Sequence, residues 1–218
     1  MILGIYGGGG LGREVLELAN DVNKGNSLWS EIVFIDDKKT YELVNNTKVF
    51  TFEEIHDQFS TNNLEIVIAI GEPETRLLLR HKVESFGFRL TILVHPTSKI
   101  NSTAQIGNGT IICYGCFISC NVKIGDNVYI QPNACVGHDT VINNNSLISS
   151  NVCVAGGCSI GSETYIGMNV PVREHVNIGS KAIIGMGSVV YQDVSDEVIV
   201  LGNPARVMKK NENHKVFK

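Results

Sequence analysis

From Ile100 to Val190, an aliphatic residue stands at every sixth position without an insertion or a slip. Neither an α-helix, with 3.6 residues per turn, nor a single strand, with a repeat of two, buries one residue in six. A chain that turns a corner after each short strand does, and its coils stack β-branched residues into one core. The period therefore predicts a solenoid whose sixteen core positions are Ile100, Ile106, Ile112, Ile118, Ile124, Ile130, Val136, Ile142, Ile148, Val154, Ile160, Ile166, Val172, Ile178, Ile184 and Val190.

With three flat faces per coil, residues eighteen positions apart stack directly on one another. Sixteen hexads then make about five coils, or roughly 25 Å of prism at the ~4.8 Å spacing of paired strands. Several core residues are followed by glycine, as in Ile106-Gly107 and Ile166-Gly167. We expect these glycines to relieve crowding and to allow unusual backbone angles at the corners.

The N-terminal segment follows a different pattern. An apolar strand runs into a glycine turn, a helix and a second strand that ends at Asp36-Asp37. Gly7, Gly9 and Gly12 fit G-x-G-x-x-G in the context that nucleotide-binding turns require. The backbone N–H groups of such a turn can approach an anion at the helix N-terminus. A tight turn with nothing bound is the alternative.

Strands and helices alternate up to residue 94, which predicts a small parallel sheet covered on both faces. Gly71 follows the third strand and so joins the glycine turn and Asp36-Asp37 at the carboxyl edge, where such sheets bind ligands. About 95 residues make only half of a dinucleotide fold, so a nucleotide with a group on its diphosphate fits better than a hydride-transfer cofactor. The expected elements are strands 2–6, 31–36, 65–70 and 89–94 and helices 11–23, 52–59 and 72–86.

His95-Pro96 marks the end of this segment, and the hexad period fails after Val190, at Asp196. We therefore expect an α/β domain (1–96), a β-helix domain (97–195) and a C-terminal cap and tail (196–218). The cap should contain a short basic helix, and residues 211–218 should be disordered. Its cationic residues could meet a phosphate-bearing ligand or simply be solvated; they are Arg206, Lys209 and Lys210.

Charge and composition restrict the classes of function. The net charge of −4 and the lack of a long basic run argue against a general nucleic-acid binder. No apolar run approaches the length of a membrane span and no signal peptide is visible, so we expect a cytoplasmic protein. All six cysteines lie within the repeats, where we expect reduced packing residues and no metal or redox site.

His138 is the histidine best placed for chemistry, two residues after the core residue Val136 and directly before Asp139. Transfer of a group to an amine or hydroxyl needs a base to take the proton of the acceptor. A carboxylate at Asp139 could hold the tautomer of the imidazole and support its basicity. By position alone, an exposed histidine on a coil face is the alternative, and His175 in a later coil fits that alternative best.

The chain up to about residue 210 resembles the hexapeptide-repeat acyltransferases. It is most similar to the branch that contains sialic acid O-acetyltransferases and the N-acetyltransferases of nucleotide-linked 4-amino-4,6-dideoxy sugars. The resemblance rests on GGGGLGREV, VFIDD, VIAIGEPETR, VGHD and GNPARVMK, taken with the repeats. It implies a left-handed parallel β-helix, although most parallel crossovers are right-handed. It also implies acetyl-CoA as co-substrate, no metal, and a homotrimer with active sites between subunits.

The resemblance also assigns site residues. It makes His138 the general base and Asp139 its acidic neighbour, and backbone N–H groups near Ala155-Gly156 would face the thioester carbonyl as an oxyanion hole does. It places the nucleotide part of the substrate on Gly9, Gly10, Leu11, Asp36, Asp37 and Gly71, and acetyl-CoA on Leu147, Ala155, Gly156, Met168 and Met186, largely through backbone groups.

Two positions depart from the pattern of the family. Leu147 stands where many relatives have a second histidine, so no side-chain contact to CoA is expected there. Gln131 stands where the loop before the base often begins with asparagine, which affects an expected contact to the sugar.

Together these features predict acetyl-CoA-dependent N-acetylation of a dTDP- or UDP-linked 4-amino-4,6-dideoxy sugar, in the synthesis of lipopolysaccharide or another surface glycan. O-acetylation of sialic acid is the alternative, but that acceptor has no diphosphate for the glycine turn. A γ-class carbonic anhydrase shares the solenoid but needs three histidines around one metal, and His138 and His175 lie thirty-seven residues apart, which is not a multiple of eighteen. A non-catalytic scaffold is the remaining alternative.

Overall fold

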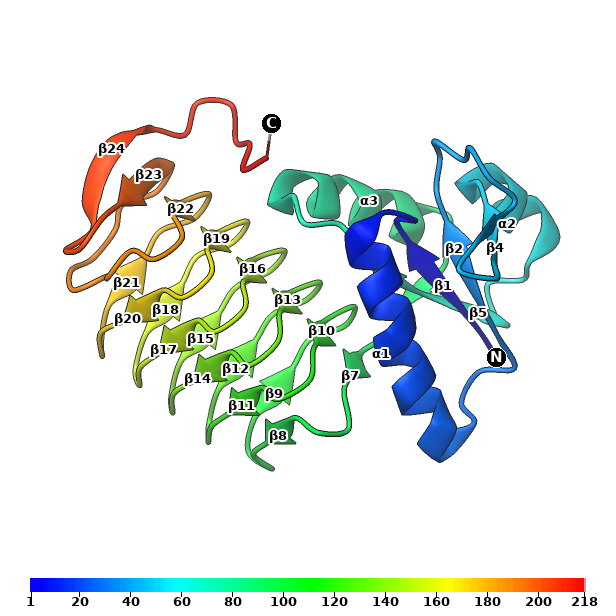
Figure 1. Ribbon diagram of the computed structural model, residues 1–218, viewed down its shortest axis with the longest axis horizontal. Coiled ribbons are helices and arrows are strands. Elements are labelled where there is room, and N and C mark those ends of the chain that lie inside the picture. Colours follow the sequence, from blue (N-terminus) through cyan, green and yellow to red (C-terminus); the bar gives the residue numbers. More distant parts are fainter. Residues whose placement is uncertain (218) are drawn as a thin grey trace.

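The computed structural model describes residues 1–217, in which an α/β domain is followed by a long β-helix (Figure 1). The α/β domain contains one sheet in the order β3-β4-β2-β1-β5-β6, parallel except for the pair of β3 and β4. Its elements are β1 (Ile2–Tyr6), α1 (Gly10–Asn26), β2 (Glu31–Ile35), β3 (Leu43–Val44), β4 (Thr47–Phe50), α2 (Phe52–Gln58), β5 (Leu64–Ile68), α3 (Pro73–Ser85) and β6 (Arg89–Leu90).

Helices cover both faces of this sheet because its strands carry apolar residues on both sides. Leu3 of β1 packs with the apolar stripe of α1, whereas Tyr6 packs on the opposite face with α2 and α3. Local signals fix where the helices begin. A capping box that starts at Thr51 opens α2, and Pro73 occupies the first turn of α3.

The strand order of the sheet reverses between β1 and β5. The chain leaves β1 to form β2 on one side and later pairs β5 on the other side of β1. Open parallel sheets bind ligands at the carboxyl ends of strands that flank such a reversal, which we call the switch point. The glycine turn follows β1 and Gly71 follows β5, so both expected nucleotide-binding segments lie at the switch point.

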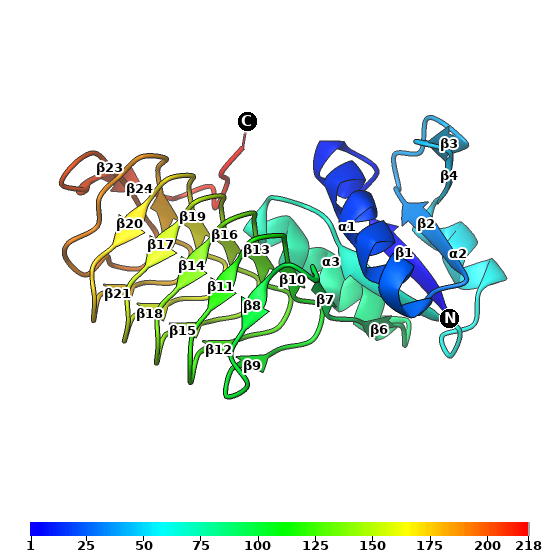
Figure 2. The same cartoon turned by 60° about the horizontal axis from the view of Figure 1, so that its bottom comes forward.

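The β-helix consists of short parallel strands that follow one another around three faces (Figures 1 and 2). The first face contains β7 (Leu93–Val94), β10 (Ile111–Ile112), β13 (Tyr129–Ile130), β16 (Leu147–Ile148), β19 (Tyr165–Ile166), β22 (Ile183–Ile184) and β23 (Val198–Leu201). The second face contains β8 (Lys99–Ile100), β11 (Phe117–Ile118), β14 (Cys135–Val136), β17 (Cys153–Val154) and β20 (Pro171–Val172). The third face contains β9 (Gln105–Ile106), β12 (Lys123–Ile124), β15 (Val141–Ile142), β18 (Ser159–Ile160) and β21 (Asn177–Ile178).

Strands pair with the strand eighteen residues later, as the hexad period predicts. Ile118 pairs with Val136 and Val136 with Val154, so the core residues form the expected ladders. Ile118, Val136 and Val154 are at most 1% exposed, and burial of each side chain contributes about 1.5–3 kcal/mol. The predicted fold class, a small parallel-sheet domain followed by a left-handed parallel β-helix of hexapeptide repeats, is confirmed.

The corners depend on a left-handed residue three positions after most of the core residues. Asn121, Asp139 and Gly157 have φ angles of 58°, 58° and 70° at such positions, which Asn, Asp and Gly tolerate best. The expectation that the glycine directly after the core residue supplies the unusual angle is therefore wrong. That glycine does relieve crowding, because a Cβ on Gly167 would lie 2.6 Å from the backbone nitrogen of Met186 in the next coil.

The α/β domain packs on the first face of the β-helix through α1, which lies beside the first coils in Figure 1. Four outward-pointing residues of this face join the apolar cluster of α1 and are at most 1% exposed: Leu93, Ile111, Tyr129 and Leu147. The strand expected at 89–94 is in fact two strands, because β6 ends the α/β sheet and β7 begins the first face. The hairpin of β3 and β4, which turns at Asn45 and Asn46, was also not predicted.

The C-terminal cap differs from the expectation. β24 (Arg206–Lys210) pairs antiparallel with β23, so the expected basic helix is wrong. Five residues cannot nucleate a stable helix, whereas the free edge of β23 offers a row of backbone partners. The expected disorder after residue 210 is wrong as well, since residues 211–217, which we call the strap, return to the α/β domain (Figure 1). Lys218 lies outside the described residues.

Within residues 1–217, no helix combines the length and the apolar character that crossing a bilayer requires.

Candidate active site

His138 stands in the turn after β14, at the corner between the second and third faces. Its Nδ1 atom lies 2.8 Å from Oδ2 of Asp139. The other carboxylate oxygen of Asp139 accepts a hydrogen bond of 2.9 Å from Nδ2 of Asn121, one coil earlier. The carboxylate is therefore held from two sides and can fix the orientation of the imidazole.

This arrangement prepares Nε2 of His138 to accept a proton. A proton on Nδ1 satisfies the bond to Asp139 and leaves the lone pair on Nε2. Hydrogen bonds from Asn121 and from His138 hold the pKa of Asp139 below its usual range, so the carboxylate is ionised at neutral pH. Because the side chain of His138 is 60% exposed, a substrate can reach Nε2.

The next coil leaves a gap beside the imidazole. Gly156 and Gly157 stand where other coils carry corner side chains, and a Cβ on Gly156 would lie 2.5 Å from Nε2 of His138. From the coil beyond, His175 reaches toward Gly157, where a Cβ would lie 2.5 Å from its Nδ1. The two glycines thus form a gap bordered by two imidazoles, which we call the glycine gap.

One backbone N–H group at the glycine gap is free to bind a ligand oxygen. The N–H of Ala155 donates to the carbonyl of Val172 at 3.0 Å, and the N–H of Gly157 donates to the carbonyl of His138 at 2.8 Å. Within residues 1–217, the N–H of Gly156 has no acceptor. Of the two predicted oxyanion donors, only Gly156 is available, because the ladder between coils uses the N–H of Ala155.

Sequence reasoning missed three residues of this corner, namely Asn121, Gly157 and His175. The same rule that placed the core residues would have found them. Asn121 precedes Asp139 by eighteen positions, and Gly157 and His175 follow it by eighteen and thirty-six.

The residues expected to contact acetyl-CoA do not gather at one place in a single chain. Leu147 is 1% exposed inside the interface between the first face and the α/β domain, so its side chain is not available to a ligand. Met168 and Met186 are 41% and 67% exposed, at the corner between the first and second faces. His138 and Gly156 lie at the corner between the second and third faces.

At the switch point, the N-terminus of α1 presents backbone N–H groups that no capping side chain engages. α1 begins at Gly10, its N-cap residue Gly9 makes no side-chain hydrogen bond, and its first turn, which includes Leu11, has no acidic residue. These N–H groups can bind an anion such as a phosphate. A Cβ on Gly12 would overlap the carbonyl of Gly7, so this glycine permits the close approach of α1 to β1.

The two neighbouring aspartates after β2 have different environments. Asp36 accepts hydrogen bonds from the N–H of Gly8 at 3.1 Å and of Lys38 at 2.9 Å, so it lies against the glycine turn as predicted. Both oxygens of Asp37 are engaged elsewhere: Oδ2 binds Tyr6 Oη at 2.6 Å and Lys82 Nζ at 2.7 Å, and Oδ1 binds the N–H of Phe52 at 3.1 Å. The structure therefore gives Asp37 a structural role.

Asp37 makes stability depend on pH. Burial alone would raise the pKa of Asp37, but the hydrogen bonds from Lys82 and Tyr6 outweigh it and lower the pKa overall. A carboxyl whose folded-state pKa is lowered stabilises the fold above its unfolded pKa, and this contribution is lost as pH falls through the folded pKa. Asp37→Asn should therefore lower the unfolding midpoint by about 2–4 °C at pH 7. In thermal scans the two proteins should converge as pH falls below the usual aspartate pKa of about 3.9 and through the lowered folded-state pKa of Asp37; a difference that does not change with pH would contradict this assignment.

Gly71 lies at the switch point as predicted, and Phe217, which the sequence did not indicate, lies beside it. A Cβ on Gly71 would lie 3.1 Å from the ring of Phe217 and 3.8 Å from the side chain of Leu11. The carboxylate of Glu72, the N-cap residue of α3, makes no capping bond and instead accepts hydrogen bonds from the strap.

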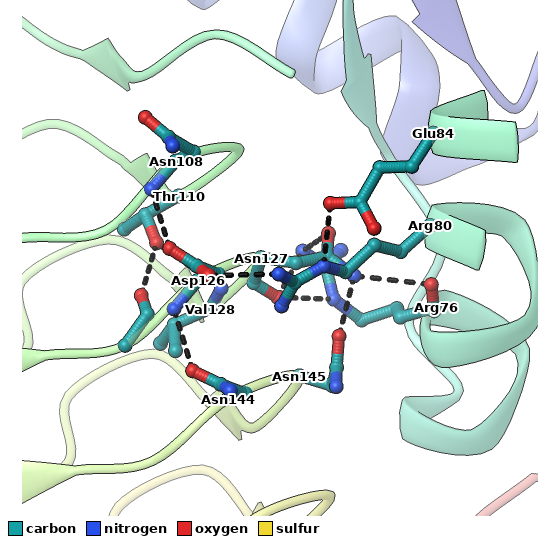
Figure 3. A network of polar contacts seen from close by, with 11 residues as sticks. Arg76, Arg80, Glu84, Asn108, Thr110, Asp126, Asn127, Val128, Asn144 and Asn145 are labelled. Atoms are coloured by element: carbon teal, nitrogen blue, oxygen red, sulfur yellow. Dashed lines mark hydrogen bonds and ion pairs between the residues drawn. The ribbon is translucent and has the colours of Figure 1, made fainter. Parts of the chain in front are cut away.

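A buried arginine fixes the α/β domain to the β-helix (Figure 3). Arg76 of α3 is fully buried, and burial lowers its pKa to about 9. Its guanidinium donates to the carbonyls of Ile68 (2.6 Å) and Ile70 (3.1 Å). On the other side it donates to the carbonyl (2.7 and 3.0 Å) and the side-chain oxygen (2.8 Å) of Asn127. One side chain thus joins the end of β5, next to Gly71, to a corner of the β-helix.

The cysteines serve packing at the positions where they are buried. Cys113 packs with the α/β domain and Cys116 with the interior of the β-helix, so they belong to different apolar clusters. Burial raises the pKa of the Cys113 thiol to about 12. In the described part of the chain, no three His, Cys, Asp or Glu side chains converge in the way that metal ligands do.

Residues 3–83 match the family described as PglD N-terminal domain, and residues 121–156 match bacterial transferase hexapeptide (six repeats). No curated protein sequence matches the chain significantly.

Solved structures resemble the whole chain. The acetyltransferase domain of PglB from Neisseria gonorrhoeae is 30% identical with a TM-score of 0.90, over 95% of this chain and 99% of that one. A variant of perosamine N-acetyltransferase from Caulobacter crescentus, in complex with CoA and GDP-perosamine, is 26% identical with a TM-score of 0.89, over 96% and 98% of the two chains. WeeI from Acinetobacter baumannii is 28% identical with a TM-score of 0.89, over 95% and 100%. This chain therefore belongs to the hexapeptide-repeat sugar acetyltransferases, in the branch whose N-terminal domain is of the PglD type.

Proposed function

We propose that the protein transfers the acetyl group of acetyl-CoA to the amino group of a dTDP- or UDP-linked 4-amino-4,6-dideoxy sugar, in the synthesis of surface polysaccharides or glycans. The observation that carries this proposal is the His138–Asp139 pair, whose Nε2 faces the glycine gap. Acetyl coenzyme A in the PglB domain, and CoA with GDP-perosamine in the Caulobacter crescentus enzyme, support the co-substrate and the acceptor class. The free N–H groups at the start of α1 favour an acceptor with a diphosphate over sialic acid.

In this reaction the neutral amine attacks the thioester carbonyl, so a C–N bond forms while the carbonyl oxygen becomes an oxyanion. Nε2 of His138 accepts the proton that the amine loses, and Asp139 stabilises the imidazolium. The free N–H of Gly156 is the donor available to the oxyanion. Collapse of the intermediate breaks the C–S bond and releases CoA, whose sulfur takes the proton from His138.

We infer that a neighbouring chain completes the site in a homotrimer. Within one chain the α/β domain covers the first face, whereas His138 lies at the corner opposite that face. A trimer whose second faces point inward would bring the His138 corner of one chain to the Met168 corner of the next. The second face suits such a contact because its outward residues from Phe117 onward carry no charge: Phe117, Cys135, Cys153, Pro171 and Val189.

The substrate assignment predicts which ligands stabilise the protein. UDP or dTDP at a hundred times its dissociation constant should add about 2.7 kcal/mol, which raises the unfolding midpoint by roughly 5–10 °C in a chain of this size. Thermal scans with UDP, dTDP, GDP and CMP, each with and without acetyl-CoA, measure this shift. Stabilisation by acetyl-CoA together with no response to any nucleotide would replace the nucleotide-linked acceptor with a sugar such as sialic acid.

A further inference from the structure

The strap is fixed to the last coils of the β-helix at its start. Asn211 is 5% exposed, its Nδ2 donates to the carbonyl of Lys181 at 2.8 Å, and its N–H donates to the carbonyl of Glu197 at 2.8 Å. His214 Nε2 lies 3.5 Å from a carboxylate oxygen of Glu197. These contacts set the direction in which the strap leaves β24.

The strap is also fixed at its far end, on the α/β domain. The backbone N–H groups of Val216 and Phe217 both donate to the carboxylate of Glu72, at 3.0 to 3.1 Å. Two consecutive N–H groups on one carboxylate define the position of the backbone, because charge-assisted hydrogen bonds are about twice as strong as neutral ones. Phe217 is thus held at a definite place beside the end of β5.

That place is the switch point. The ring of Phe217 lies against Gly71 and near Leu11, which come from the segments after β5 and β1 respectively. On another side it meets the ring of Tyr165 edge to face, with centroids 5.6 Å apart. The side chain of Phe217 is nevertheless 52% exposed, so part of the ring remains open to a ligand. Within the described chain, the strap is the segment that brings an aromatic ring to Gly71.

The charge near the strap suits an anionic ligand. A cavity of about 490 Å³ lies between β24 and the strap, and its lining includes Lys209, Lys210, Lys215 and Phe217. Glu212 is the one acidic residue in that lining. Within the strap Lys215 and Glu212 balance each other, and Lys209 and Lys210 of β24 give the lining of the cavity a net positive charge that attracts a diphosphate.

We propose that the strap forms a wall of the nucleotide site, with the ring of Phe217 stacking on the base and the Glu72 carboxylate holding the strap in place. This inference rests on the proposed function, since it requires a nucleotide at the glycine turn. Phe217 is then a residue that binds the substrate, and Glu72 is a residue that positions Phe217. Stacking accepts any base, so the strap contributes affinity for the nucleotide while other residues choose among bases.

Removal of the ring is therefore expected to weaken nucleotide binding. Phe217→Ala should raise the dissociation constant about tenfold for whichever of UDP, dTDP and GDP binds the unmodified protein best, as measured by calorimetry. Phe217→Trp should keep the affinity, and its fluorescence should be quenched when the nucleotide binds. Trp29, the one natural tryptophan, is 5% exposed and gives the background. Tyr191→Ala removes an equally exposed aromatic ring from the β-helix and should leave nucleotide affinity unchanged.

Glu72→Gln tests the anchor. If Glu72 acts through the strap, Glu72→Gln and Phe217→Ala together should weaken binding little more than Phe217→Ala alone. Equal affinity of Phe217→Ala and the unmodified protein would overturn the proposal, as would additive losses in the double variant. Tighter binding by Phe217→Ala would instead identify the strap as an inhibitory segment. If the unmodified protein binds no nucleotide but uses acetyl-CoA, the proposed acceptor fails and the strap proposal fails with it, which separates that case from a failure of the strap alone.

Discussion

Replacing His138 by alanine is expected to lower kcat by about 10²–10⁴, because the amine then loses the group that accepts its proton. The KM for acetyl-CoA should change little, since the imidazole faces the glycine gap where the acceptor must arrive. Release of CoA thiol with a nucleotide-linked amino sugar measures both quantities. A variant with unimpaired kcat would show that His138 is an exposed corner residue only.

Two matched variants distinguish a catalytic role of His138 from a purely structural role of its corner. His175→Asn removes the other imidazole that borders the glycine gap and keeps a residue that tolerates its φ of 58°. It should retain most of the activity. Asp139→Asn likewise preserves the left-handed corner but takes the charge from the bond to Nδ1 of His138. It should lose activity to a smaller extent than His138→Ala, because the base remains and only its orientation and charge partner are altered.

The corner of His138 could be predicted because the β-helix is periodic. The six-residue repeat decides which residues point into the core, and the eighteen-residue spacing decides which residues stack. The repeat alone therefore places His138 and Asp139 two and three residues after a core position of a middle coil. The same eighteen-residue spacing identifies Asn121 as the residue that stacks on Asp139 and donates to it. The left-handed corners were equally visible, as asparagine, aspartate or glycine three positions after most core residues.

The expected nucleotide site at the switch point could be predicted only in outline. Its details depend on contacts between segments that lie far apart in the sequence and are not related by a repeat. Asp36 and Asp37 are adjacent in sequence, yet only Asp37 meets Tyr6 and Lys82, and this depends on where α3 lies. Val216 and Glu72 are separated by 144 positions. The polar composition of the tail suggested disorder, whereas a few specific hydrogen bonds determine its path.

A second large effect is expected at Arg76. Arg76→Met should lower the free energy of unfolding by roughly 3–5 kcal/mol, because it leaves several buried oxygens without donors. These oxygens belong to Ile68, Ile70 and Asn127, on both sides of the contact between the domains. Arg76→Lys should restore little of the loss, since an ammonium lacks the planar fork that reaches both sides. Denaturant unfolding followed by linear extrapolation measures the change.

Arg80→Met is the matched control, because it alters the same helix one turn later and the same corner of the β-helix. Arg80 binds Asp126 and Glu84 through partly exposed ion pairs, so its loss should cost about 1 kcal/mol or less. Arg76→Met should also change the shape of the transition: without the shared guanidinium, the α/β domain should unfold before the β-helix, and nucleotide should stabilise only the first step. A single transition with unchanged free energy would show that α1 and the first face hold the domains together without Arg76. Two transitions would show that the buried arginine couples the switch point of the α/β domain to the β-helix that carries His138.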